Sequence, residues 1–185
     1  LPIIVSEWGS EASNSVLHDG NFDAIHALSV IRQLIDRVDK AFTFEIKDGP
    51  GSKQFWGRFG LITHEKYGLV KKPKFYALKF LNNLSGERLK VDGEGTFITG
   101  LAAKDGNVLK LLLVNYDGSQ SNSENVPVTI NNLPLANYSL KTQILFGRKT
   151  EEYVKAENGT IIREIYLPPQ SAVLLELTKL APLYS

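Results

Sequence analysis

The spacing of apolar residues divides the sequence into two parts. From residue 1 to about residue 86, short apolar runs alternate with segments in which apolar residues recur every three or four positions. Beyond that point the helical period disappears, and short runs rich in β-branched and aromatic residues are separated by turn signals. The first pattern indicates alternating strands and helices, and the second indicates antiparallel sheets. We therefore expect an α/β part followed by an all-β part, with the boundary near Gly86.

Two strands are predicted in the first part. Residues 2–5 form a short continuous apolar run, which is typical of a parallel strand buried on both faces. Residues 6–9, Ser-Glu-Trp-Gly, are expected to form the loop that follows it. A second strand with two apolar faces is predicted over residues 41–46. Residues 47–72 are rich in glycine and aromatic residues, and a loop of this length is usually functional.

Two helices are predicted between and after these strands. Apolar residues recur at helical spacing over residues 22–38, and Asp19 or Asn21 is the candidate cap. Pro73 opens the second helix at a position where proline is tolerated, and Gly86 ends it. The apolar stripe of this helix consists of Phe75, Leu78, Leu81 and Leu84.

The order strand, helix, strand, loop, helix corresponds to consecutive βα units. Such units imply a parallel sheet with right-handed crossover connections. Two units cannot close a sheet by themselves. Because a (β/α)₈ TIM barrel needs about 250 residues, most of a barrel of this kind would lie outside this chain.

Six strands are predicted in the second part, over residues 96–104, 108–116, 126–130, 138–146, 160–167 and 172–178. The breaks between them include Asp105-Gly106, Asp117-Gly118 and Asn158-Gly159. Hairpin-type turns at this spacing indicate an antiparallel β-sandwich.

Glu7 is the main candidate for chemistry, because it follows the first predicted strand directly. In barrels and open α/β sheets, catalytic residues gather at the carboxyl ends of the strands. Retaining glycosidases use one carboxylate as nucleophile and a second, ~5 Å away, as acid/base. A carboxylate beside Trp8 suits attack on an anomeric carbon. A strand-end glutamate is equally often a structural salt-bridge partner, so position alone leaves both interpretations open.

Several segments together resemble one family. They are Ile3–Trp8, His18-Asp19, Phe42–Phe44, Gly57–Ile62, Lys72–Asn82 and Leu167–Val173. In these segments the chain resembles the last barrel units of clan A glycoside hydrolases and, more narrowly, glycoside hydrolase family 39, the β-xylosidase and α-L-iduronidase family. The resemblance covers nearly the whole chain, with most of its specificity in residues 3–8 and 57–82.

The resemblance implies a division of roles along the chain. Residues 1–86 would run from strand 7 to helix 8 of a TIM barrel, with Glu7 as the nucleophile, and residues 87–185 would form a β-sandwich accessory domain. The family's acid/base glutamate follows an asparagine at the end of strand 4, and this chain contains no Asn-Glu pair. The chain also departs from related barrels on strand 8, where they often place a tryptophan and this sequence has Phe42-Thr43-Phe44.

Four further residues are candidate substrate contacts: Trp8, His18, Glu45 and Trp56. The two tryptophans offer flat faces on which a sugar can stack, although aromatic residues at such positions serve packing as often. Glu45 could bind a sugar hydroxyl, but we favour a pairing with Lys47 or Arg58. The histidine could reach the site from the loop after the first strand, and a structural role is the preferred alternative.

Composition narrows the function classes. A net charge of +1 without charged runs gives no electrostatic case for nucleic acid or an anionic membrane as partner. No apolar run approaches the ~20 residues of a membrane-spanning helix. With no cysteine and three scattered histidines, no metal and no cofactor are expected. The chain has no methionine and opens in an apolar run, which suggests a fragment or processed chain, secreted or cytoplasmic.

The leading hypothesis is the carboxy-terminal part of a retaining glycoside hydrolase, inactive in isolation because its acid/base residue lies elsewhere. Its partners would be a carbohydrate substrate and the rest of the barrel, supplied by the upstream part of the same enzyme or by another chain. A βα part left alone would expose a large apolar surface, so it is expected to pack against another chain or copy, or to be poorly ordered. The alternatives are a β-sandwich module that binds carbohydrate or braces a partner, and one chain of a split glycosidase. Since the second part has no tryptophan, bracing is favoured over sugar binding.

Overall fold

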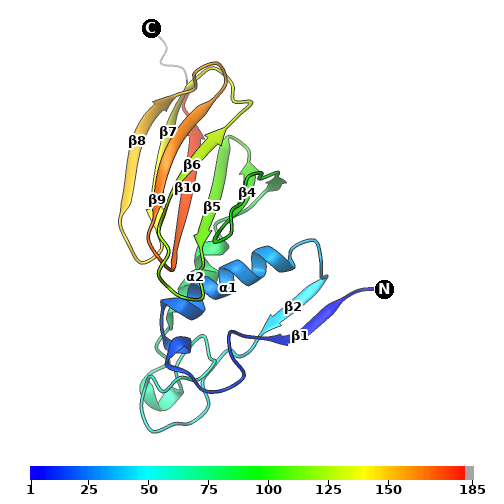
Figure 1. The fold of residues 1–185 in the computed structure, drawn as a ribbon, viewed down its shortest axis with the longest axis vertical. Helices are drawn as coiled ribbons and strands as arrows, with labels where there is room; N and C mark the ends of the chain where they lie inside the picture. Colours follow the sequence, from blue (N-terminus) through cyan, green and yellow to red (C-terminus); the bar gives the residue numbers. More distant parts are fainter. Residues whose placement is uncertain (182–185) are drawn as a thin grey trace. The chain divides into compact units, whose positions relative to one another are not determined.

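The computed structural model describes residues 1–181, which fall into two compact units (Figure 1). Unit 1 comprises Leu1–Asn82, and unit 2 begins at Asn83. The sequence pattern placed the boundary a few residues later, near Gly86. Each unit is described by itself below.

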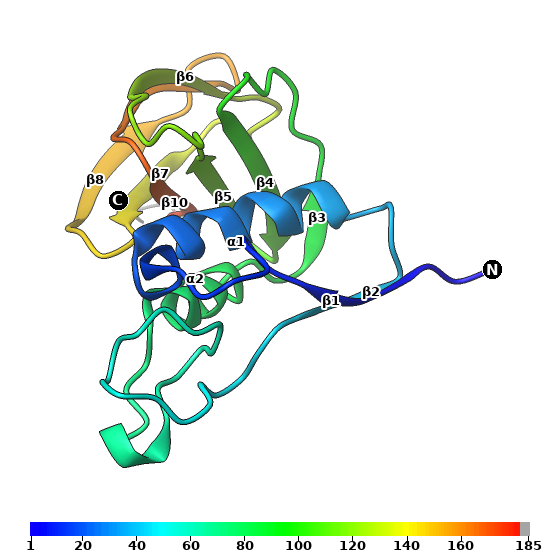
Figure 2. The same ribbon diagram turned by 60° about the horizontal axis from the view of Figure 1, so that its bottom comes forward.

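Unit 1 contains one parallel strand–helix–strand connection. Strand β1 (Ile4–Trp8) pairs with β2 (Lys40–Thr43), and α1 (Asn21–Leu34) connects them. The two strands lie side by side in both views (Figures 1 and 2). The remaining elements are the short 3₁₀ helices η1 (Val16–Asp19) and η2 (Glu65–Tyr67) and the helix α2 (Pro73–Leu81). Helices α1 and α2 pack against each other.

The prediction that residues 6–9 form a loop was wrong for three of the four residues. Ser6, Glu7 and Trp8 belong to β1 because pairing with β2 continues as far as Trp8 opposite Thr43. The backbone N–H of Phe44 also donates to the Trp8 carbonyl at 3.1 Å. Pairing with a neighbouring strand, which the local sequence does not show, sets where this strand ends.

The cap and the length of the first helix also differ from expectation. The cap of α1 is Gly20, not Asp19 or Asn21, and the helix ends at Leu34, because Ile35 adopts an extended ψ of 133°. The Asp19 carboxylate is used elsewhere, accepting a hydrogen bond from the Gly57 N–H at 2.6 Å. A side chain engaged over this distance along the chain is not free to cap the helix.

The second helix begins as predicted, with Pro73 in its first turn. Its buried face, however, consists of Lys74, Ala77 and Phe80, whereas Phe75 and Leu78 are only half-buried. The face is offset by one residue from the apolar stripe because Lys74 points inward to a carboxylate described below.

The strands of unit 1 were expected to be buried on both faces, and the described chain leaves them open. Ile4 and Phe42 are each 56% exposed, and Ile46 is 74% exposed. No described residue covers these side chains. Unit 1 therefore carries apolar strand surface that monomers seldom expose.

Unit 2 consists of two antiparallel sheets that share one core. Its strands are β3 (Glu87–Leu89), β4 (Ile98–Asp105), β5 (Val108–Asn115), β6 (Glu124–Ile130), β7 (Asn137–Ile144), β8 (Lys149–Lys155), β9 (Ile161–Leu167) and β10 (Ser171–Lys179). The large sheet has the order β3-β4-β5-β10-β7-β8, and β6 pairs with β9 in the small sheet. The shared core includes Leu111 and Leu175 from the large sheet and Val128 and Leu167 from the small one. Inward-facing aliphatic residues from both sheets hold the unit together.

Six of these strands coincide with the predicted runs, and β3 and β8 were not predicted. Strand β8 reads Lys-Thr-Glu-Glu-Tyr-Val-Lys, and Val154 is its one buried residue. It lies at the edge of the large sheet, bonded to β7 alone. Polar edge strands carry little apolar alternation, since one side faces solvent and charge discourages further pairing.

Candidate functional site

Glu7 lies on an irregular stretch at the carboxyl end of β1. Val5 pairs with Ala41 and Trp8 with Thr43, so Ser6 and Glu7 together lie opposite Phe42 alone. This extra residue is a β-bulge, a feature that re-aims side chains and is frequent next to active sites. Glu7 is exposed, and none of the described residues forms an ion pair or side-chain hydrogen bond with it.

Trp8 lies next to this carboxylate and is half-buried. Its indole N–H is buried and has no hydrogen-bond partner in the described part of the chain. Trp56, in the long loop, likewise buries an indole N–H that has no described partner. Buried donors without acceptors are costly, and in both cases described residues cover the indole N–H itself.

Glu45 follows β2 and pairs with the Arg58 guanidinium, with Oε1 and Nη2 3.5 Å apart. The alternative partner, Lys47, instead binds Glu65 at 2.6 Å. Of the two expected pairings, the one with Arg58 is therefore observed. Burial raises the pKa of Glu45 above its ordinary value, and the charge of Arg58 partly opposes this shift.

The Arg58 guanidinium also contacts two aromatic rings, with its carbon 5.5 Å from the Trp56 ring centroid and 5.2 Å from that of Phe59. Cation–π contacts of this kind fix the orientation of a guanidinium. Trp56 in turn lies so close to Gly51 that a side chain there would come within 2.3 Å of the ring. The loop thus holds an aromatic ring, a cation and the carboxylate of Glu45 in one cluster.

His18 is 1% exposed and packs against this cluster. Its Nδ1 lies 2.9 Å from the Gly57 carbonyl oxygen, and its ring centroid is 4.6 Å from that of Phe59. The ring Nε2 is buried without a described partner. Its place in η1, packed against the long loop, agrees with the structural alternative.

Sequence reasoning missed a network of buried charges beneath these residues. Lys72 Nζ lies 2.6 Å from Asp19 Oδ1 and 3.3 Å from both Asp48 carboxylate oxygens. Lys74 Nζ lies 2.8 Å from Asp23 Oδ2. One signal in the sequence was the pair of lysines around Pro73, at the start of the predicted helix. Lysines at this positive end of a helix are unfavourable unless carboxylates pair with them.

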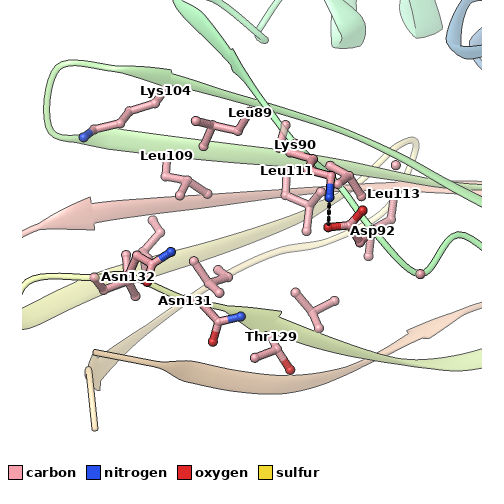
Figure 3. A pocket seen from close by; sticks show the side chains of 18 of the residues that line it. Leu89, Lys90, Asp92, Lys104, Leu109, Leu111, Leu113, Thr129, Asn131 and Asn132 are labelled. Carbon is pink, nitrogen blue, oxygen red and sulfur yellow. Dashed lines mark ion pairs between the residues drawn. The ribbon is translucent and has the colours of Figure 1, made fainter. Parts of the chain in front are cut away.

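Unit 2 contains a separate cavity of about 960 Å³ between its sheets. Figure 3 shows mainly aliphatic side chains from β3 and β5 across from polar side chains near β6, with the Lys90–Asp92 ion pair (2.9 Å) at one side. The one aromatic residue in its described lining, Tyr138, is 3% exposed and donates its hydroxyl to the Pro134 carbonyl. This lining offers no exposed ring face for a sugar.

No group of three or more histidine, aspartate or glutamate side chains in residues 1–181 is placed to hold a metal ion. In the same residues, no helix combines the length and apolarity needed to cross a membrane.

Comparison with known proteins finds glycoside hydrolases among the proteins that this chain resembles. No family model matches the chain. A β-xylosidase of Caldicellulosiruptor saccharolyticus is 26% identical over 141 residues, which cover 70% of this chain and 28% of that protein.

Solved structures give the same result at the level of fold. The GH39 enzyme of Xanthomonas axonopodis pv. citri matches 97% of this chain and 45% of its own, with a TM-score of 0.73 and 19% identity. A monomeric β-xylosidase of Caulobacter crescentus matches 98% of this chain and 46% of its own, with a TM-score of 0.74 and 20% identity. The resemblance to family 39 predicted from the sequence is confirmed, and this chain spans less than half the length of each of these relatives.

Proposed function

We propose that this chain is the carboxy-terminal part of a retaining glycoside hydrolase and that Glu7 is its nucleophile. In this proposal β1, α1, β2 and α2 are the last two βα units of a TIM barrel, within residues 1–86. The two sheets of residues 87–185 form the accessory β-sandwich. The relatives, of which this chain spans less than half, support the assignment.

The observation that carries the proposal is the setting of Glu7. It is an exposed carboxylate without an ion-pair partner among the described residues, on a bulge at the carboxyl end of a strand in a parallel pair. Catalytic residues of barrels lie at this edge. A purely structural glutamate would be expected to have a cation in reach, as Glu45 has Arg58.

The chemistry follows from a carboxylate in this position. Glu7 attacks the anomeric carbon, and the bond to the leaving oxygen breaks as an acid outside this chain protonates that oxygen. The resulting glycosyl ester on Glu7 is then hydrolysed by water, which gives its proton to the same external group. The sugar leaves with retained configuration.

Trp8, Trp56 and Glu45 are proposed as substrate contacts around this centre. Both tryptophans are half-buried, so each keeps part of its surface exposed, and an exposed ring face could stack on a sugar. Glu45, held by Arg58, can accept a hydrogen bond from a hydroxyl. His18 contributes indirectly by holding the loop that carries Trp56.

The remainder of the barrel is the proposed partner of unit 1. The exposed side chains Ile4, Phe42 and Ile46 give it an apolar surface to cover. The acid/base glutamate would come from that partner, either upstream in the same protein or on another chain. The 185-residue chain alone is therefore expected to be inactive.

Because the curated relative is named a β-xylosidase, an aryl β-D-xyloside is the substrate to test first. The full-length protein should hydrolyse it, and peptide mass spectrometry after a rapid acid quench should find the added sugar on the peptide containing Glu7. Sugar on another carboxylate, or release of inverted product, would refute the assignment of Glu7.

A further inference from the structure

Two lysines at the start of α2 are buried far more completely than lysines usually are. Lys72 precedes the helix and is 0% exposed, and Lys74 lies in its first turn. Lys72 contacts residues of the connections that follow both parallel strands. Lys74 contacts Asp23 of α1, which in turn binds Ser10 in the loop after β1. One of these loops carries Trp56 and Arg58, and the other begins directly after Glu7 and Trp8 at the end of β1.

Lys72 holds the segment of residues 57–60 from beneath. Its Nζ donates to the Arg58 carbonyl at 2.5 Å while pairing with the carboxylates of Asp19 and Asp48. Those carboxylates accept the backbone N–H groups on either side of Arg58, Gly57 to Asp19 at 2.6 Å and Gly60 to Asp48 at 2.7 Å. Three backbone groups of one short segment thus converge on Lys72 and its partners.

Lys74 acts in the same way on the other loop. Its Nζ pairs with Asp23 Oδ2 at 2.8 Å, and Asp23 Oδ1 accepts the Ser10 hydroxyl at 2.7 Å. Ser10 is three positions after Glu7, with Trp8 between them. The segment that follows the proposed nucleophile is therefore connected to α2 by one hydrogen bond and one ion pair, both made by Asp23.

Stability alone does not account for this arrangement. Two lysines at the positive end of a helix dipole are unfavourable by themselves, and buried ion pairs are often no more stabilising than apolar residues of the same volume. Directional contacts to specific backbone groups, in contrast, are what an apolar core cannot provide.

We infer that Lys72 and Lys74 are positioning residues, each assigned to one loop of the site. Lys74 sets the segment after Glu7, and Lys72 sets the segment that carries Arg58. The inference rests on the proposed function only in naming these loops as catalytic, since the contacts themselves are independent of it.

The two tryptophans of the chain report on the two loops separately. The 185-residue chain labelled with 5-fluorotryptophan should give two dispersed ¹⁹F resonances, assigned with Trp8→Phe and Trp56→Phe. Lys74→Met should displace the Trp8 resonance by more than its linewidth and leave that of Trp56. Lys72→Met should displace the Trp56 resonance and leave that of Trp8. Lys79→Met, an exposed lysine of the same helix, should move neither.

Removal of one lysine leaves a carboxylate buried without its cation, which can unfold the chain. A second variant that removes both charges therefore separates a local displacement from unfolding. Lys74→Met combined with Asp23→Leu removes both charges and still loses the Ser10 bond, so it should displace the Trp8 resonance in a folded chain. Unmoved resonances in the folded double variant would overturn the inference. Equal displacement of both tryptophan resonances by either lysine substitution would also overturn the inference. The same holds if the wild-type resonances appear at the position of the unfolded chain. If the full-length protein hydrolyses no aryl glycoside, the proposed function fails while the positioning result stands.

Discussion

The two units of this protein bury different kinds of side chain. In unit 1 the largest fully buried side chains include Lys72, Lys74 and His18 beside two aliphatic residues of α1. In unit 2 they are leucines and a valine of β5, β7, β9 and β10, with Asn115 as the polar exception. Unit 2 therefore depends on non-directional apolar packing, and unit 1 depends on charges that fix loops.

The exposed apolar surface also differs between the units. Unit 1 leaves Ile4, Phe42 and Ile46 uncovered on or beside its parallel strands. Unit 2 contributes aliphatic residues from both sheets to one shared core. The contrast indicates that unit 2 completes its own core, whereas unit 1 has strand faces that no described residue covers.

The sharpest test of this contrast separates activity from stability. Glu7→Gln in the full-length protein should lower kcat by roughly 10⁴-fold or more, as loss of a nucleophile does. Because Glu7 is exposed and unpaired among the described residues, the free energy of unfolding should change by no more than about 0.5 kcal/mol. Steady-state kinetics and urea unfolding measure the two quantities. Glu164→Gln, an exposed glutamate on β9, is the matched control and should change neither.

Lys72→Met should destabilise unit 1 by about 3–5 kcal/mol, because the buried carboxylate of Asp48 and the largely covered carboxylate of Asp19 would lose their cation. Amide hydrogen exchange should accelerate in α1 and α2. Lys79→Met supplies the control for the substitution itself. Equal exchange rates in the two variants would show that the buried pairs contribute little.

Leu175→Ala should destabilise unit 2 by about 3 kcal/mol through the cavity it leaves in the shared core, where Leu175 is 1% exposed. Faster amide exchange in β5, β7 and β10 would report the loss. Ile162→Ala removes methylenes from an exposed residue of β9 and should cost less than about 0.5 kcal/mol. A comparable loss in both variants would contradict a core that unit 2 closes by itself.

The smallest expected effect is a pH dependence from Glu45. Burial raises its pKa in the folded state, so its contribution to stability is present below its ordinary pKa of 4.5 and is lost as the pH rises through the raised value. Wild type should therefore lose stability relative to Glu45→Gln between acid and neutral pH. Urea midpoints across this range test the sign. If wild type instead became more stable relative to the variant as the pH rises, the attraction of Arg58 would have a larger effect on the pKa of Glu45 than burial has.

Much of the fold could be predicted because it rests on local patterns. The change from helical period to short β-branched runs predicted the alternation of unit 1 and six strands of unit 2. Strand β8 could not be predicted, because an edge strand whose one buried residue is Val154 has no apolar alternation. The end of β1 was also missed, since Ser6 and Glu7 are polar and join the strand only by pairing with β2.

The site could be predicted in part for the same reason. Glu7, Glu45 and Trp56 stood out by residue type and by their places after strands, and the pairing of Glu45 with Arg58 was expected and observed. The catalytic role of Glu7 stays a prediction. The roles of Lys72 and Asp23 were not foreseen, because their partners lie far away in the sequence and no local pattern links them.

The sequence by itself determined the succession of elements, the resemblance to family 39 and the residue types available for chemistry, since these depend on short-range spacing and motif. Only the tertiary structure decided that Glu7 sits on a bulge, that Asp19 binds Gly57 instead of capping a helix, and that two lysines are buried. Hydrogen bonds and ion pairs need precise approach of distant segments. Their partners are therefore chosen by the packed chain and not by its local order.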